Sequence, residues 1–157
     1  MKINEYSIAA LSFLGDAVYE LEIRNHLVEL GIKDGDRLHR ECTKYVRAEA
    51  QAKVVKALLK EAEAADAGCA EAGGAENSDG EKVTGHSFVL AAEEVALVKR
   101  ARNHKFANRS RSADPVEYRL ATGLEALMGR LYLMGDQGRI EELAKRAMEI
   151  IGESNRR

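Results

Sequence analysis

Apolar residues recur at steps of three and four along most of the chain, which is the period of an amphipathic α-helix. The first such pattern predicts a helix over about 6–30, because Gly31 then offers a stop. A second pattern begins after Asp34 or Asp36, either of which suits a helix N-cap, and predicts a helix that ends near Lys60. No strand-like alternation of apolar and polar residues is sustained, so the sequence predicts an all-α protein.

Three further helices are predicted in the second half of the chain. A short apolar pattern over 95–98 leads directly into a run of basic residues. Asp114 is followed at once by a proline and three residues later by a glutamate, and this capping signature predicts a helix over about 115–134. A last amphipathic pattern covers 140–151. We therefore expect one bundle-like domain over 1–157.

An acidic stretch interrupts the helical patterns. Residues 61–81 hold seven acids and no Lys or Arg, and their alanines and glycines offer too little apolar surface to offset the entropy of ordering. We predict a flexible acidic insertion at about 62–85, with a prolongation of the second helix through the first residues, EAEAA, as the alternative for its start. The formal net charge is -2, so removing these seven negative charges leaves +5 on the rest of the chain. The folded part is therefore predicted to be basic.

Several other classes of protein lack their sequence signals here. No apolar run is long enough to span a membrane, and the first residues, MKINEYS, lack the basic and apolar regions of a signal peptide. We therefore expect a cytoplasmic protein without membrane contact. Cys42 and Cys69 have no spacing typical of a zinc or redox site, and the histidines do not pair at ligand spacing. Gly-rich phosphate loops, the HExxH zinc motif and the GxSxG nucleophile turn are absent from the sequence.

The first candidate for chemistry is LSFLGDAVYE at residues 11–20, in the middle of the first predicted helix. A glycine inside a helix costs about 1 kcal/mol relative to alanine, so Gly15 indicates that another backbone or group approaches closely there. Asp16 follows this glycine and would lie beside the contact. The alternative is that Asp16 is an ordinary solvated residue of the helix.

The second candidate is TGLEALMGRLYL at residues 122–133, where small residues again flank an acid. Glu125 lies just off the apolar stripe of its helix and should be partly buried, so its carboxylate needs a cation, a hydrogen-bond donor or a metal. Two such acids from separate helices would suit Mg²⁺, which keeps several waters and takes few oxygen ligands from a protein. The alternative is an ion pair between Glu125 and Arg119 or Arg130.

The third candidate is KRARNHKFANRSR at residues 99–111, which holds six cations and no acid. Such a run is typical of a surface that binds phosphates. Phe106 is the only aromatic residue in the run, so base stacking on single strands has little support. Contact with the backbone of a duplex needs no aromatic residues and is therefore favoured. The alternative is a solvated charged face. The candidate RNA-binding residues are Lys99, Arg100, Arg102, Asn103, His104, Lys105, Arg109 and Arg111.

The quoted segments resemble the ribonuclease III family. LSFLGDAVYE resembles the family's signature motif, and TGLEALMGRLYL resembles its second catalytic helix. YVRAEAQA at residues 45–52, RARN at 100–103 and EYRLATGLEAL at 117–127 are similar to the Mini-ribonuclease III branch. Together these motifs cover most of the chain outside the acidic stretch, and their order and spacing are more specific than any one of them.

The resemblance implies an all-helical homodimer that cuts both strands of double-stranded RNA with Mg²⁺, without the double-stranded-RNA-binding domain of longer relatives. Asp16 and Glu125 match the family's catalytic, metal-binding acids. Phe13 falls where the signature motif contributes to the dimer contact, with an ordinary core position as the alternative. In bacteria this branch matures the large-subunit (23S) ribosomal RNA precursor, and ribosomal proteins that present the substrate are a further expected partner.

The chain departs from the family pattern at a few positions. Longer ribonucleases III place further acids before each catalytic carboxylate, whereas this chain has Ala9, Ser12 and Thr122 there, so the number of metal ions stays open. RARN has Ala101 where the branch usually has glycine. The nearest rival is a non-catalytic helical RNA-binding or ribosome-assembly module, which needs the basic run but not both acids. A second rival is a helical nucleotide pyrophosphohydrolase, which needs acids clustered at three- to four-residue spacing on facing helices. Asp16 and Glu125 lack such partners apart from Glu20, so this rival is less favoured.

Overall fold

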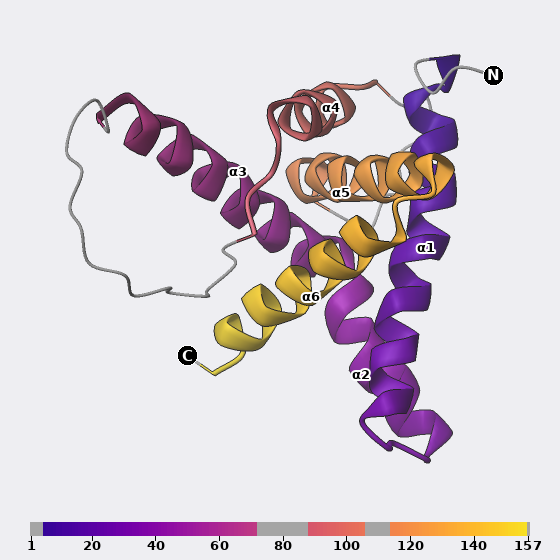
Figure 1. Ribbon diagram of the computed structural model, residues 1–157. Coiled ribbons are helices and arrows are strands. Elements are labelled where there is room, and N and C mark those ends of the chain that lie inside the picture. The colour runs from indigo at the N-terminus through magenta and orange to yellow at the C-terminus, as the bar shows by residue number, and fades with distance from the viewer. Residues whose placement is uncertain (1–4, 72–87, 106–113, 157) are drawn as a thin grey trace.

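The structure, a computed structural model, describes residues 5–71, 88–105 and 114–156. It is all-α over these residues, as the sequence predicts, and no strand occurs among them. None of the helices in these ranges is long and apolar enough to cross a membrane. The helices in chain order are α1 (Ile8–Glu29), α2 (Gly35–Val46), α3 (Ala48–Glu71), α4 (Ala92–Arg102), α5 (Pro115–Met134) and α6 (Gln137–Ser154) (Figure 1).

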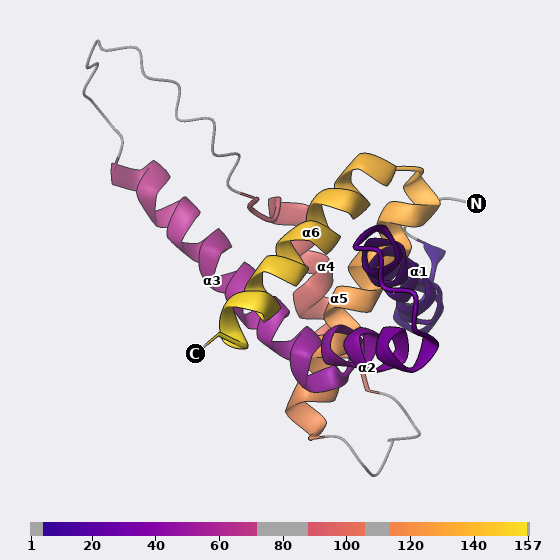
Figure 2. The same cartoon turned by 90° about the horizontal axis from the view of Figure 1, so that it is seen from below.

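Helix α5 lies at the centre and positions the others (Figures 1 and 2). α1 crosses it, and α3, α4 and α6 pack against its other sides. α5 can take this place because apolar or small residues surround most of its circumference, which is the pattern of a buried helix. Its buried residues are Leu120, Ala121, Thr122, Gly123, Leu124, Ala126, Leu127, Met128, Gly129 and Leu131.

The helix ends follow the capping signals in the sequence. The Asp34 carboxylate accepts a backbone N–H of the first turn of α2 at 2.7 Å, so Asp34 rather than Asp36 is the N-cap. Asp114 accepts a backbone N–H of α5 at 2.8 Å and precedes the proline at the start of that helix. α5 ends at Gly135, whose φ of 72° is the left-handed conformation that glycine adopts without a steric penalty. The predicted bounds of α5 are confirmed.

The second predicted helix is two helices in the structure, and the second of them, α3, runs past the predicted end near Lys60 to Glu71. Arg47 has an extended conformation with φ -64° and ψ 148°, and it separates α2 from α3. No glycine or proline marks this break in the sequence. The side chain of Gln51 stabilises it, since Nε2 donates a hydrogen bond of 2.9 Å to the carbonyl oxygen of Val46 at the end of α2.

The predicted acidic insertion overlaps the end of α3. α3 continues to Glu71, so residues 62–71 are helical. The alanines of this segment favour a helix, and an ion pair between Glu61 and Arg146 joins this part of α3 to α6. The rest of the predicted insertion, 72–85, lies outside the described residues.

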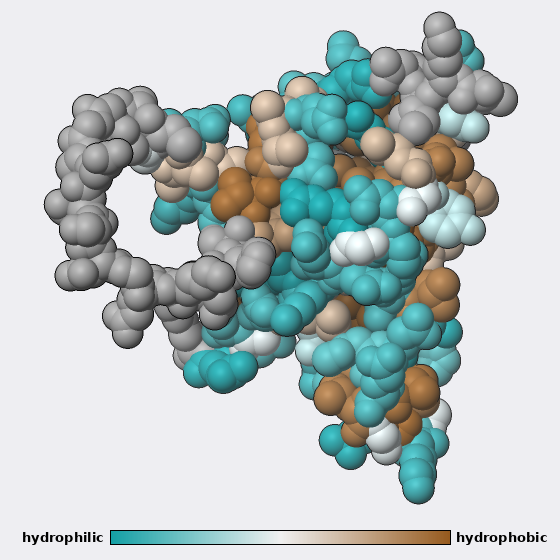
Figure 3. All heavy atoms as spheres, in the orientation of Figure 1, coloured by the Kyte–Doolittle hydropathy of each residue, from teal (hydrophilic) through white to brown (hydrophobic). Residues whose placement is uncertain are grey.

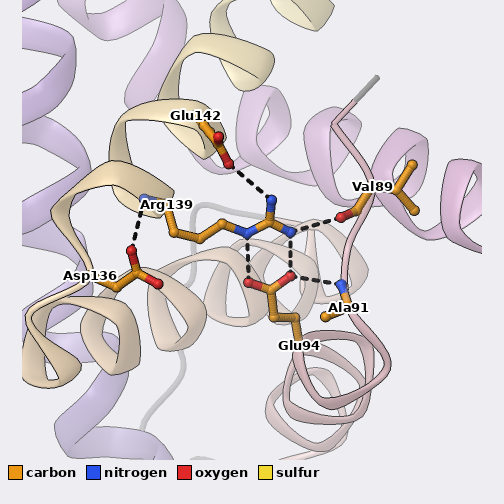
Figure 4. A network of polar contacts seen from close by, with 6 residues as sticks. All are labelled: Val89, Ala91, Glu94, Asp136, Arg139 and Glu142. Carbon is orange, nitrogen blue, oxygen red and sulfur yellow. Dashed lines mark hydrogen bonds and ion pairs between the residues drawn. The ribbon is translucent and has the colours of Figure 1, made fainter. Parts of the chain in front are cut away.

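A buried ion pair joins the start of α4 to α6 (Figure 4). Glu94 is only 6% exposed, and Arg139 donates to its two carboxylate oxygens at 2.9 and 2.7 Å. Arg139 also donates to the carbonyl of Val89 at 2.7 Å, and the backbone N–H of Ala91 donates to Glu94 at 2.8 Å. Burial opposes ionisation of Glu94, but the hydrogen bonds from Arg139 and Ala91 outweigh it and hold its pKa below the ordinary value. The network fixes where α4 begins.

Candidate active site

Two glycines allow α1 and α5 to cross in backbone contact. A Cβ atom on Gly15 would lie 1.6 Å from the carbonyl oxygen of Glu125 and 2.7 Å from the backbone nitrogen of Gly129. A Cβ atom on Gly129 would lie 2.0 Å from the carbonyl oxygen of Leu11. Neither gap has room for a side chain, so both positions require glycine. The close approach predicted at Gly15 is confirmed.

The crossing brings Asp16 and Glu125 together. Asp16 follows Gly15 in α1, and Gly15 faces the backbone of Glu125 itself. Burial raises the pKa of Glu125 to about 8, and the negative charge of Asp16 adds to this rise. Burial and the charge of Glu20 raise the pKa of Asp16 as well. The two predicted acids therefore lie close enough for their ionisation to be coupled, and their catalytic role stays a prediction.

The ion pair that is the alternative for Glu125 does not occur in this arrangement of the described residues. Arg130 pairs with Glu93 at 3.6 Å, and no ion pair of Glu125 occurs within the described ranges. Asp16 is solvent-exposed, as the alternative of a solvated helix residue expects, and its charge also raises the pKa of Glu125. An ionised Glu125 consequently lacks the compensating positive charge that a partly buried carboxylate requires.

The residues present fit a cation that takes few protein ligands. No group of three or more His, Cys, Asp or Glu side chains able to hold a metal occurs in the part of the chain that the structure describes. Ser12 and Thr122, which stand where longer relatives have acids, donate their hydroxyls to carbonyls of their own helices at 3.3 and 3.0 Å. Two neighbouring carboxylates fit a divalent cation that keeps most of its waters better than an ion that needs a closed protein cage.

Sequence reasoning missed one polar residue at this site. Gln51 is 1% exposed and lies on α3, and its nearby amide opposes the rise of the pKa of Glu125. The signal available in the sequence is weak. It is a glutamine one helical turn before Val54 and Val55, which are both buried.

The basic run begins where α4 crosses α5. A Cβ atom on Gly123 would lie 3.0 Å from Cγ1 of Val98, so α4 packs on α5 two residues before Glu125 in the sequence. The last turn of α4 is basic, which also suits the negative end of the helix dipole. Of the predicted RNA-binding residues, Lys99, Arg100, Asn103 and Lys105 are exposed, Arg102 and His104 are partly buried, and Arg109 and Arg111 lie outside the described residues.

One side of α1 exposes large apolar side chains. Phe13 is 85% exposed, Leu21 55% and Val28 61%. Their spacing places them on one side of the helix, and Figure 3 shows apolar patches along the edge of the molecule that α1 forms. Phe13 is therefore not an ordinary core residue of this chain. Its predicted dimer contact stays a prediction.

Comparisons with known proteins agree with this arrangement. The family model of the ribonuclease III domain matches residues 9–136. The Mini-ribonuclease 3 of Enterococcus faecalis is 38% identical over 93% of this chain and 91% of its own length. The Mini-ribonuclease 3 of Streptococcus pneumoniae is 35% identical over 90% of each chain, and that of Brevibacillus brevis 36% over 92% of this chain and 87% of its own.

A solved structure shares the fold. The crystal structure of a Fusobacterium nucleatum protein superposes with a TM-score of 0.66 at 27% identity, over 94% of this chain and 95% of that one. Both the sequence and the helical arrangement thus match across nearly the whole length. The chain therefore belongs to the ribonuclease III family, in its Mini-ribonuclease 3 branch, and is an endoribonuclease of the kind that acts on double-stranded RNA.

Proposed function

We propose that this protein hydrolyses phosphodiester bonds of double-stranded RNA with Mg²⁺ held by Asp16 and Glu125. The observation that carries the proposal is the convergence of these two carboxylates at the α1–α5 crossing, where the charge of Asp16 raises the pKa of Glu125. Members of the ribonuclease III family generally depend on a divalent metal. Both acids are the oxygen ligands that such an ion prefers.

The two acids have different surroundings and hence different tasks. Glu125 is the more buried and holds a proton up to about pH 8, so it binds a cation by exchanging that proton. Asp16 is exposed and is therefore accessible to RNA. A divalent cation supplies positive charge that neutralises the phosphodiester group and activates water for its hydrolysis. The chain itself holds the carboxylates on helices that Gly15 and Gly129 lock together.

The basic end of α4 is proposed to bind the RNA backbone. Lys99, Arg100 and Lys105 are exposed there, and α4 packs on the part of α5 that carries Glu125. Phosphate contacts made by Lys and Arg release counterions, so they make binding salt-dependent. Replacing Arg100, Arg102 and Lys105 together with Ala should weaken duplex binding and flatten its salt dependence. An unchanged slope of log affinity against log salt would contradict the assignment.

The substrate, the assembly and the location are further parts of the proposal. The match to Mini-ribonucleases 3 over nearly the whole chain supports a single catalytic domain. The large-subunit (23S) ribosomal RNA precursor as substrate and ribosomal proteins as presenting partners follow only from the resemblance of the sequence motifs to this branch. The exposed face of α1 supports a homodimer through Phe13. We expect Phe13→Asp to sediment as a monomer where the unaltered protein sediments as a dimer. The cytoplasmic location expected from the sequence belongs to the same proposal.

A duplex cleavage assay tests the proposed activity. Purified protein is mixed with a long RNA duplex or with either of its single strands, each with Mg²⁺ or with a chelator. We expect both strands of the duplex to be cut with Mg²⁺, no cutting with the chelator, and little cutting of the single strands. Binding of the duplex without cleavage at any Mg²⁺ concentration would instead identify the chain as a non-catalytic RNA-binding module.

A further inference from the structure

Gln51 is a polar side chain that the core of this protein encloses completely. It lies in the first turn of α3 and is 1% exposed. It belongs to the side of α3 that is buried, since Val54, Val55 and Leu58 follow it at helical spacing and are all at most 2% exposed. α3 packs against α5 and α6. A polar residue at such a position needs a specific reason.

One hydrogen bond and one electrostatic contact define how the Gln51 amide lies. Nε2 donates to the carbonyl oxygen of Val46 at 2.9 Å, and this acceptor determines which end of the amide carries the nitrogen. The same amide lies near enough to Glu125 to lower the pKa of that carboxyl. An amide lowers a carboxyl pKa by donating an N–H to the ionised form, so the second Nε2 hydrogen is the one directed at Glu125.

The other end of the amide gains nothing from this position. Oε1 of Gln51 is buried and accepts no hydrogen bond from any residue in the described ranges. An acceptor buried without a donor destabilises a fold, so a methionine of similar size would serve packing better. Glutamine at this position is therefore explained by its donor and not by its contribution to the core.

We propose that Gln51 is a positioning residue for the catalytic site: its amide, anchored on the end of α2, holds the Glu125 carboxylate in the orientation in which it shares a divalent cation with Asp16. This inference rests on the proposed function, because it assigns Gln51 a role in the cation site. Hydrogen-bond partners behind a metal ligand commonly fix the ligand's orientation. Here the anchor is the helix break at Arg47, which brings the Val46 carbonyl within reach of Gln51.

The test measures binding of Mg²⁺ alone by isothermal titration calorimetry, together with the melting temperature of each variant. Gln51→Met keeps the bulk and removes the donor. Gln51→Asn keeps the amide but is one methylene too short to span Val46 and Glu125. For both variants we expect the dissociation constant of Mg²⁺ to rise about tenfold or more. Leu58→Met is the matched control, because it alters the same buried side of α3 without removing a polar group, and its Mg²⁺ affinity should stay unchanged.

The outcomes separate this inference from the proposed function. Loss of affinity in Gln51→Met or Gln51→Asn, with a melting temperature no lower than that of Leu58→Met, supports the positioning role. Either variant, if folded, that binds Mg²⁺ as tightly as the unaltered protein overturns it and leaves the proposed function intact. An unaltered protein that binds no Mg²⁺ overturns both.

Discussion

Gly15→Ala probes the helix crossing on which the site depends. The added Cβ would lie 1.6 Å from the carbonyl oxygen of Glu125, whereas real Cβ atoms stay at least 3.0 Å from such neighbours. Helices α1 and α5 must therefore separate by about 1.4 Å or more, since a close-packed interior offers no other space. Overpacking of this kind costs roughly 1–3 kcal/mol or more, and alanine recovers at most about 1 kcal/mol through its higher helix propensity.

Because the obstructing atoms are backbone and cannot rotate away, we expect Gly15→Ala to lose about 3 kcal/mol of unfolding free energy. The melting temperature should fall by roughly 6–12 °C. Cleavage should fall further than stability explains, by about a hundredfold at a temperature where the variant is folded, because a displacement near 1 Å separates Asp16 from Glu125.

Circular dichroism melts and duplex cleavage rates measure the two effects. Gly138→Ala is the control, because a Cβ at Gly138 meets nothing within 4 Å and its backbone φ is not positive. It should be neutral or slightly stabilising. A Gly15→Ala protein that melts and cleaves like the unaltered protein would show that the helices do not meet at this glycine.

Two further predictions concern charge and burial. Without metal, the folded chain keeps a proton on Glu125 between about pH 4.5 and 8 while the unfolded chain has lost it, so the unfolding free energy should fall as pH rises through this window. Urea unfolding with chelator should then show Glu125→Gln to be more stable than the unaltered protein by roughly 2–4 kcal/mol at pH 8, and equal stability would contradict the raised pKa. Arg139→Ala leaves Glu94 buried without its cation and should cost about 3–5 kcal/mol. Arg146→Ala breaks a more exposed pair and should cost about 1 kcal/mol or less, so equal losses in the two variants would refute the contrast.

The elements that the sequence predicts well are those with local signals. Helix α5 has a capped start and a glycine stop, and its observed range matches the prediction from Pro115 to Met134. The close contact at Gly15 was also predictable, because a glycine inside a long helix weakens that helix unless a neighbouring group packs against it. Asp16 and Glu125 could be singled out by the small residues beside them, but their convergence depends on which helices cross.

The features that the sequence did not predict depend on contacts between distant residues. The break at Arg47 has no glycine or proline, and the contact that stabilises it is made by the buried side chain of Gln51. α3 extends into the acidic stretch as far as Glu71, where composition alone indicated disorder. Local alanine content and the ion pair between Glu61 and Arg146 outweighed the low hydrophobicity.

Single-turnover cleavage of an RNA duplex by Asp16→Asn tests the central claim most directly. The substitution keeps the size of an exposed side chain and removes one of the two charges that are proposed to hold Mg²⁺. At saturating Mg²⁺ and saturating protein, we expect the cleavage rate to fall at least a hundredfold while duplex affinity stays within a few-fold. Cleavage by Asp16→Asn at the rate of the unaltered protein would contradict the account.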